Sequence, residues 1–298
     1  MSFIKSFSVG YGDMFYIFHG TDSFTIIDCC YSNEDYRKIN FNEIKKIASL
    51  KGINRFISTH PDDDHIKGIK KFCEEIGIAN FYVVKNDAIK LVETDDFRKY
   101  CELRDGSKAF YIHKGCSRKW LNQTNEERGG AGINFLWPDI ENKFFKEELQ
   151  KAKEGKAFNN ISPVFTYSLK ESIKVMWMGD MESEFLDKVK EYIDWSEVDV
   201  LFAPHHGRIS GKVPTDVLKK LNPQIIVIGE APKEDLYSYP GYNTILQNLA
   251  GDICFNCDEK VHVYVSEYSY NVDFLDNVGA FDKAFGHYIG SFKPKGEK

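Results

Sequence analysis

The residues best suited to chemistry in this 298-residue chain are histidines and aspartates gathered in short segments. The densest segment runs from Thr59 to His65, reads Thr-His-Pro-Asp-Asp-Asp-His, and holds two imidazoles and three carboxylates. It follows Ile53–Ser58, which we expect to be a buried strand, so the motif should form a loop at the strand end, a common place for functional groups. Imidazole and carboxylate are ligand types that suit Zn²⁺, Mn²⁺ or iron, which favours a metal site. The alternative is a solvated acidic loop in which Asp64 caps a helix.

Two later segments repeat this arrangement. Asp180 follows the apolar run Ile173–Met178, and His205 and His206 follow the apolar run Val198–Phe202. The alternative for Asp180 is a cap on the next helix. Four of the eight histidines nevertheless fall in just two strand-end loops. Three strand ends that offer His and Asp in this way favour a metal site assembled at one edge of a sheet.

Strands and helices are expected to alternate along the chain, which places it in the mixed α/β class with helices covering the sheets. Period-two and apolar runs predict strands, and spacings near three or four predict helices. The main expected elements are strands at Met14–Phe18, Phe24–Asp28, Ile53–Ser58 and Ile225–Ile228, and helices at Glu34–Leu50, Ile66–Ile76 and Tyr242–Leu249. We expect residues 1–298 to form a single domain, with a lid or insertion at about 86–130.

Composition narrows the function. Hydrophobic residues make up 42% of the chain, enough for a sizeable core. The formal charge of −6 argues against a dedicated, non-specific nucleic-acid binder, since neutralising phosphates needs Lys and Arg. We find no apolar run of the roughly 18–20 residues that a membrane span requires and no secretory signal at the N-terminus, so no membrane partner is expected. Seven scattered cysteines fit reduced thiols and a cytoplasmic location.

The chemical segments also resemble a known family. His60-x-Asp62-x-Asp64-His65 is similar to the HxHxDH signature of the metallo-β-lactamase superfamily, and most similar to the metallo-β-lactamase-like domain of the competence protein ComEC and its relatives. The resemblance covers nearly the whole chain in order. Its other elements are Val9-Gly10-Tyr11-Gly12-Asp13, Ile26-Ile27-Asp28, Leu136-Trp137-Pro138, Asn160-Ile161-Ser162, Gly179-Asp180 and His205-His206-Gly207.

This resemblance implies an αββα four-layer sandwich of the metallo-β-lactamase fold, with two divalent metal ions, Zn²⁺ or Mn²⁺, at one edge. Asp180 would bridge the ions, Asp64 would orient or deprotonate the attacking water, and His205 would lie beside the site as a ligand or a phosphate contact. Asn160 and Ser162 would be two further catalytic residues, which donate hydrogen bonds to the developing negative charge. The implied metal ligands are His60, Asp62, Asp64, His65, Asp180 and His206.

Three positions depart from the superfamily pattern. Asp62 replaces the second His of the signature, as is familiar among ComEC-like proteins. His113 is the only His between the first motif and the bridging Asp, where the superfamily has a further ligand. Tyr239 stands where a late family element has His, and Tyr ligates metals far less often. Occupancy of the second metal position is therefore left open.

The function expected first is hydrolysis of a phosphodiester, in a nucleic acid or a nucleotide-like molecule, by a metal-activated water. The alternatives are hydrolysis of a small ester, lactone or amide, since one fold hosts many substrates, and a catalytically weak binding or regulatory protein. A basic, aromatic-lined groove beside the metals, built from residues 85–119 and the neighbouring Trp120, would favour a polymeric phosphodiester. Lys114, Arg118 and Lys119 are the candidate cations for that groove.

Overall fold

Two mixed β-sheets form the centre of the protein, which we describe from a computed structural model covering residues 2–31, 34–276 and 285–296. The larger sheet has nine strands in the order β15-β14-β13-β1-β2-β3-β4-β5-β6, and the smaller has six in the order β12-β11-β10-β9-β8-β7. The strands are β1 (Ser2–Ser6), β2 (Phe15–Phe18), β3 (Ser23–Ile27), β4 (Ile53–Ser58), β5 (Phe81–Val84), β6 (Ala109–Ile112), β7 (Ile133–Trp137), β8 (Val164–Ser168), β9 (Lys174–Trp177), β10 (Val200–Phe202), β11 (Ile225–Ile228), β12 (Thr244–Leu246), β13 (Ile253–Cys257), β14 (Val261–Val265) and β15 (His287–Phe292).

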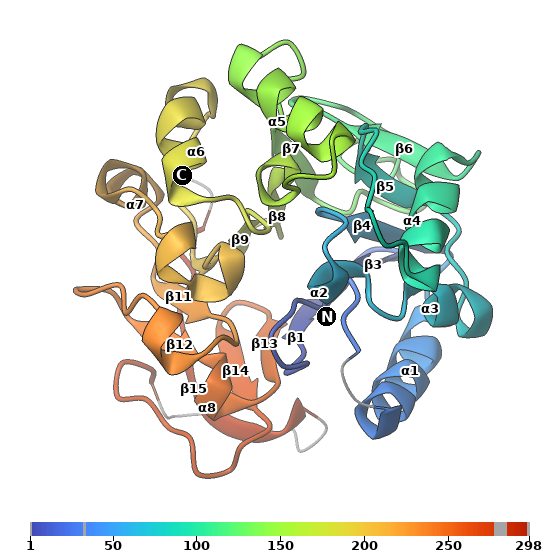
Figure 1. The fold of residues 1–298 in the computed structure, drawn as a ribbon. Helices are drawn as coiled ribbons and strands as arrows, with labels where there is room; N and C mark the ends of the chain where they lie inside the picture. Colours follow the sequence, from blue (N-terminus) through green and yellow to red (C-terminus); the bar gives the residue numbers. More distant parts are fainter. Residues whose placement is uncertain (1, 32–33, 277–284, 297–298) are drawn as a thin grey trace.

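Helices flank both sheets (Figure 1). The α-helices are α1 (Glu34–Ala48), α2 (Asp63–Ile66), α3 (Ile69–Glu75), α4 (Asp95–Asp105), α5 (Lys143–Lys153), α6 (Ser183–Val189), α7 (Thr215–Leu221) and α8 (Gln247–Ala250). Short 3₁₀ turns are η1 (Asn159–Ile161), η2 (Lys190–Tyr192), η3 (His205–Gly207), η4 (Ile209–Gly211) and η5 (Lys233–Asp235). No helix in the described part of the chain combines the length and the apolar character that crossing a membrane requires.

The two faces of the large sheet bury different partners, because successive side chains of a strand point to opposite sides. Ile27 and Ile57 belong to the core between the sheets, together with residues of β7, β8 and β9. Their chain neighbours Ile26 and Phe56 belong to a second core, which they share with side chains of α1, α3 and α4. In Figure 1 these helices lie on one side of the molecule, and α6 and α7 lie on the other. The αββα sandwich implied by the sequence resemblance is therefore confirmed.

Parallel pairing brings several strand ends to the same edge. Strand β3 pairs in parallel with β4, β4 with β5, and β5 with β6. In the smaller sheet, β9 pairs in parallel with β10, and β10 with β11. The carboxyl ends of these strands consequently point the same way within each sheet, and the segments that follow them are the ones that carry the His and Asp motifs.

Two sequence predictions of helices need correction. The helix expected at Ile66–Ile76 is divided into α2 and α3, because Gly68 takes a left-handed φ of 94° between them. The helix expected at Tyr242–Leu249 is wrong at its start: Thr244–Leu246 is strand β12, which pairs with β11, and α8 begins only at Gln247. A buried Ile245 suits both a helix and a strand, and its pairing with Val227 in the parallel ladder shows that the segment is a strand. The segment 86–130, for which we expect a lid or insertion, contains α4 and the edge strand β6.

Candidate metal centre

Four strand ends supply the candidate site. Asp28 follows β3, His60 follows β4, Asp180 follows β9 and His206 follows β10. Ile27 and Ile57 are direct neighbours in the parallel ladder, so the segments after them start side by side. In the small sheet the segments after β9 and β10 also lie side by side, because the His205 backbone N–H donates to the Gly179 carbonyl at 3.0 Å.

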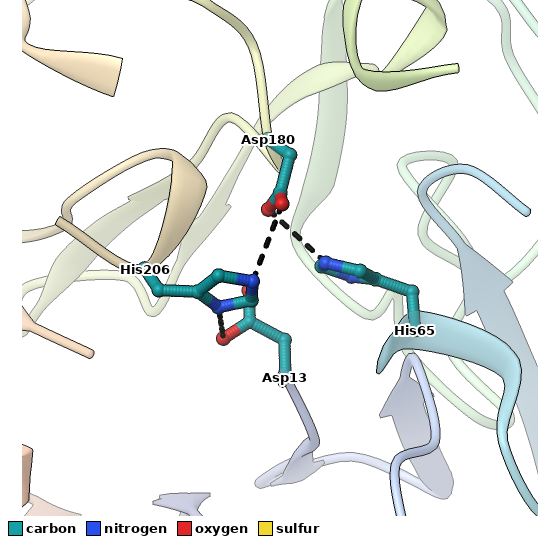
Figure 2. Close-up of side chains that lie close together, drawn as sticks. All are labelled: Asp13, His65, Asp180 and His206. Carbon is teal, nitrogen blue, oxygen red and sulfur yellow. Dashed lines mark hydrogen bonds and ion pairs between the residues drawn. The ribbon is translucent and has the colours of Figure 1, made fainter. Parts of the chain in front are cut away.

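The centre of the site is a cluster of two carboxylates and two imidazoles (Figure 2). Asp13, His65, Asp180 and His206 each present one ligand atom, and these atoms all lie within 4.8 Å of one another. Asp180 holds the middle position: its Oδ1 lies 3.1 Å from His65 Nε2, and its Oδ2 lies 3.2 Å from His206 Nε2. Asp13 and His65 lie in segments that connect strands of the large sheet, and Asp180 and His206 lie in segments that connect strands of the small sheet, so only the folded chain assembles them.

The other residues expected as ligands lie around this cluster. His60 Nε2 is 3.5 Å from Asp62 Oδ2 and 4.0 Å from Asp180 Oδ2. Asp64 Oδ2 is 3.2 Å from His206 Nε2. The structure therefore brings all six side chains predicted as ligands to one edge of the sandwich, while their role as ligands stays a prediction.

The donor set fits a divalent cation. His60 Nε2, His65 Nε2 and Asp180 Oδ1 are fully buried, and none of them has a hydrogen-bond partner of acceptable geometry among the described residues. Buried polar atoms are normally satisfied, so three such atoms in one place call for a further partner. Imidazole nitrogen and carboxylate oxygen are the ligand atoms that Zn²⁺, Mn²⁺ and iron accept.

A buried network fixes the two histidines of the first motif. Asp28 is fully buried and accepts three hydrogen bonds: from the Thr59 backbone N–H at 2.8 Å, from Thr59 Oγ1 at 2.5 Å and from His65 Nδ1 at 2.9 Å. The Thr59 hydroxyl, whose proton is used on Asp28, can accept from His60 Nδ1 at 3.1 Å, and Ser162 Oγ lies 3.2 Å from the same nitrogen. With the proton held on Nδ1, each ring turns the lone pair of Nε2 towards the cluster.

Asp13 orients the third imidazole in the same way. Its Oδ1 lies 3.2 Å from His206 Nδ1, so Asp13–His206 repeats the carboxylate–imidazole pairing of Asp28–His65. Asp13 and Asp28 belong to the motifs that carry the family resemblance, but the sequence predicts no role for either. For Asp28 a signal was available, since it is a lone carboxylate directly after an apolar strand, as Asp180 is.

Strong mutual charge effects mark the cluster. Burial raises the pKa of Asp64, but the hydrogen bond from His206 and the charge of His65 bring it down to about 2. Burial also raises the pKa of Asp180, and the charges of His206 and His65 outweigh it and hold this pKa well below its usual value. For His65 and His206, burial lowers the pKa, whereas the charge of Asp180 raises it to well above the usual value. The negative charge that attracts these protons would equally attract a divalent cation.

The backbone around Asp180 and His206 is unusual. His205 and His206 have φ values of 53° and 56°, a left-handed conformation that costs energy for residues with a Cβ and that concentrates at functional sites. Gly179 has a φ of 51°, and a Cβ there would lie only 2.5 Å from Ser162 Oγ. Glycine at 179 is thus required both by the turn and by the close approach of Ser162.

The other three residues predicted to be catalytic, His205, Asn160 and Ser162, make different contacts. His205 Nε2 is 3.8 Å from Asp180 Oδ2, while its Nδ1 lies 2.9 Å from Ser210 Oγ. The Asn160 amide donates to Glu148 at 3.2 Å and to Glu182 at 3.1 Å. In this structure Ser162 Oγ also accepts from the Asp180 backbone N–H, at 3.2 Å. The predicted role of Asn160 and Ser162 as donors to a developing charge stays a prediction, and the contacts observed here position other side chains.

His113 and Tyr239, which mark departures from the sequence pattern of the family, lie outside the cluster of ligand atoms. His113 is exposed, and its Nδ1 lies 3.0 Å from the Lys114 carbonyl. Tyr239 is buried, with its ring packed edge-to-face on Tyr237 at 4.9 Å.

The cations expected to form a basic groove beside the metals do not gather there, and Lys114 pairs with Asp194 at 2.9 Å. Arg118, Lys119 and Trp120 line a pocket together with Ile53, the first residue of β4, whereas His60 follows the last. These side chains therefore lie at the opposite end of β4 from the metal cluster.

Comparisons with known proteins return structural likenesses only. No family model matches the chain, and no curated protein matches it. Among solved structures, a variant of the β-hydroxylase CmlA aligns with a TM-score of 0.45 and 11% identity over 86% of this chain and 54% of that one. CmlA from Streptomyces venezuelae, a diiron β-hydroxylase, aligns with a TM-score of 0.42 and 13% identity over 79% and 46%. A protein assigned to the Zn-dependent hydrolases of the metallo-β-lactamase superfamily, from Thermotoga maritima, aligns with a TM-score of 0.35 and 14% identity over 82% of both chains. This chain thus spans about half the length of the CmlA proteins, and the values are too low to assign it a family or an activity.

Proposed function

We propose that the protein is a metal-dependent hydrolase that cleaves a phosphodiester, in a nucleic acid or a nucleotide-like molecule. The observation that carries the proposal is a group of three fully buried atoms, His60 Nε2, His65 Nε2 and Asp180 Oδ1. None makes a hydrogen bond of acceptable geometry among the described residues, although His65 Nε2 and Asp180 Oδ1 lie 3.1 Å apart. The carboxylates of Asp62 and Asp64 lie beside this group. This is the donor set that a pair of divalent cations, Zn²⁺ or Mn²⁺, would use.

When bound, such cations supply a water that is deprotonated near neutral pH and positive charge for the oxygens of the scissile group. The chain's own residues prepare the place for this. Asp28 and Asp13 hold His65 and His206 with their second nitrogens turned inward. Asp64 is held ionised by His206 and His65 at the edge of the cluster, where its side chain keeps 36% of its exposure. It can orient a nucleophilic water by accepting a hydrogen bond, and it can receive the proton only from a water that is already acidified, because its own pKa is low.

The ligand chemistry supports a phosphodiester as the substrate. Carboxylates are as numerous as imidazoles in and around the cluster, and carboxylate oxygens suit the harder cations that also bind phosphate oxygens. The carboxylates are those of Asp13, Asp62, Asp64 and Asp180. The sequence resemblance to the ComEC-type domain points to the same substrate class.

Hydrolysis of bis-p-nitrophenyl phosphate tests the proposal, measured with Zn²⁺, with Mn²⁺ and after chelation. Two variants remove the chemistry: Asp64→Ala removes the proton acceptor and Asp180→Asn removes the central charge. Asp63→Asn is the matched control, because Asp63 lies in the same loop but is exposed and pairs with Lys90 at 2.6 Å. Bound metal is counted for each protein by inductively coupled plasma mass spectrometry.

We expect metal-dependent turnover in the wild type and in Asp63→Asn, and a loss of at least about 100-fold in both other variants, the size typical of removing a general base. Metal bound without phosphodiester turnover would reject the substrate class and move the search to esters and lactones. Absence of bound metal from protein supplied with both cations would reject the hydrolase.

A further inference from the structure

A second polar pocket lies at the end of the large sheet opposite the metal cluster. Its volume is about 260 Å³, and residues at the start of β4, before β5 and in the segment 118–128 line it. The wall includes four cationic side chains, Arg55, Arg118, Lys119 and Arg128, together with the indole of Trp120. Because β4 has six residues and a strand rises about 3.3 Å per residue, this pocket lies roughly 15 Å or more from the metal cluster.

Most of this positive charge has no counter-ion. Neither Arg55, which is only 3% exposed, nor Arg118 nor Lys119 has a carboxylate within 4.0 Å among the residues that the structure describes. Arg128 alone is paired, with Asp22 at 3.2 Å and Glu127 at 3.6 Å. Burial lowers the pKa of Arg55, the interaction with Tyr82 raises it in part, and the nearby charge of Arg118 lowers it further. A buried charge is ordinarily paired, so this pocket lacks its partner.

Hydrogen bonds to the protein fix the guanidinium groups of Arg55 and Arg118 but use only part of their N–H donors. Arg55 donates to Thr25 Oγ1 at 3.1 Å and to the Trp120 carbonyl at 2.9 Å. Arg118 donates to Asn80 Oδ1 at 3.1 Å and packs on the ring of Tyr82 at 5.3 Å.

Three further donors of this wall are buried without a partner in the described chain: Arg55 Nε, Arg118 Nη1 and Trp120 Nε1. Water could satisfy single donors, but it leaves the charges of the two arginines uncompensated. An oxyanion with several acceptor oxygens satisfies both the donors and the charge, and planar guanidinium groups are the usual partners of phosphate.

We propose that this pocket binds a phosphate group, carried by free phosphate or by a nucleotide. The pocket is larger than one phosphate needs, so it has room for part of the group that the phosphate carries. The site works independently of the metal cluster, because none of its residues belongs to that cluster and the length of β4 separates the two.

Calorimetric titration tests the site with two probes, inorganic phosphate and adenosine monophosphate, at low ionic strength and with EDTA present to exclude binding through metal. Arg118→Met is the main variant, because methionine keeps an unbranched apolar stem over Tyr82 and removes the charge. Arg98→Met is the control, an exposed arginine on α4 that pairs with Asp95. Circular dichroism and thermal melting verify that each variant is folded.

We expect both probes to bind the wild type and Arg98→Met equally, and to bind Arg118→Met at least tenfold more weakly. If Arg118→Met does not fold, Lys119→Met replaces it, because this lysine side chain is exposed, and we expect a severalfold loss of affinity. Tighter binding of the nucleotide than of phosphate assigns the pocket to nucleotides, and equal binding assigns it to free phosphate. Absence of phosphate binding in the wild type, or equal binding in the folded pocket variants, would overturn the proposal without touching the metal-dependent hydrolase.

Discussion

Replacing Asp28 by Asn tests whether the carboxylate behind His65 prepares the metal cluster. Asparagine tolerates the left-handed φ of 54° at this position and has nearly the same shape, so the change is confined to hydrogen bonding. Asp28 accepts from Thr59 and from His65 Nδ1, and all three donors are buried. An amide has one acceptor oxygen and one NH₂ donor, so either orientation sets the NH₂ against a donor.

The consequences can be worked through for each orientation. If the NH₂ faces the Thr59 N–H, that buried N–H loses its acceptor, which costs about 1–3 kcal/mol of the free energy of unfolding. If it faces His65, the imidazole must accept at Nδ1 and carry its proton on Nε2, the nitrogen that faces the cluster. This tautomer cannot ligate. Loss of such a supporting carboxylate lowers metal affinity by about 10–100-fold, equivalent to roughly 1.4–2.7 kcal/mol.

Two measurements follow the Asp28→Asn variant: metal affinity by competition with a chelator of known affinity, and the free energy of unfolding in urea with EDTA present. Asp63→Asn, in the same motif but exposed, should match the wild type in both. If Asp28→Asn holds metal as tightly as the wild type, the reasoning about the tautomer of His65 is refuted. A loss of stability with unchanged affinity would make Asp28 a structural residue only.

Three further predictions concern stability. Saturation with Zn²⁺ or Mn²⁺ at about 100 times the dissociation constant should raise the free energy of unfolding by about 2.7 kcal/mol over EDTA-treated protein, and equal urea midpoints would contradict this. Asn142→Ala should cost about 1 kcal/mol in urea unfolding, because the Asn142 side chain caps α5 by accepting from the Phe144 N–H at 2.9 Å. Burial lowers the pKa of Lys5, but the charges of Asp252 and Glu43 outweigh it and raise this pKa above 10.5. The ion pairs therefore contribute fully below pH 10.5 and are lost as the pH rises through the higher folded value. As the pH rises above 10.5, the wild type should lose more stability than Lys5→Met, and equal losses would count against this assignment.

Strand ends were the most predictable part of the site. Short runs with β-branched and apolar residues predicted β4 and β11 with their observed bounds, because such runs suit the buried strands of a covered sheet. The ionisable residues after β9 and β10 share an edge because these two strands are parallel neighbours. The motif after β4 belongs to the other sheet, so only the packing of the two sheets brings it to the same place, and the local sequence could not give that packing.

Elements whose pattern fits two periods were predicted poorly. Tyr242–Leu249 has apolar residues that suit a helix, yet Ile245 pairs with Val227 at the edge of the small sheet. Strand β1 was not predicted, because Ser2–Ser6 is short. It is stabilised by pairing with β2 on one side and with β13 on the other, and β13 is far away in sequence. In both cases tertiary pairing outweighs the local preference.

Asp13 shows why part of the site lay beyond sequence reasoning. It follows no strand, and it reaches His206 because the turn before it packs against the first metal motif. The Asp13 N–H donates to the Asp64 carbonyl at 3.1 Å. A Cβ on Gly12 would lie 2.5 Å from both that same carbonyl oxygen and Cys30 Sγ. Only glycine permits this approach, so Gly12 determines where the Asp13 carboxylate lies, although no ionisable group marks it. Gly12→Ala should accordingly displace Asp13, release His206 from its carboxylate and weaken metal binding while leaving every side chain of the cluster in the sequence. Unchanged metal affinity in a folded Gly12→Ala protein would show that the turn can adjust without moving Asp13.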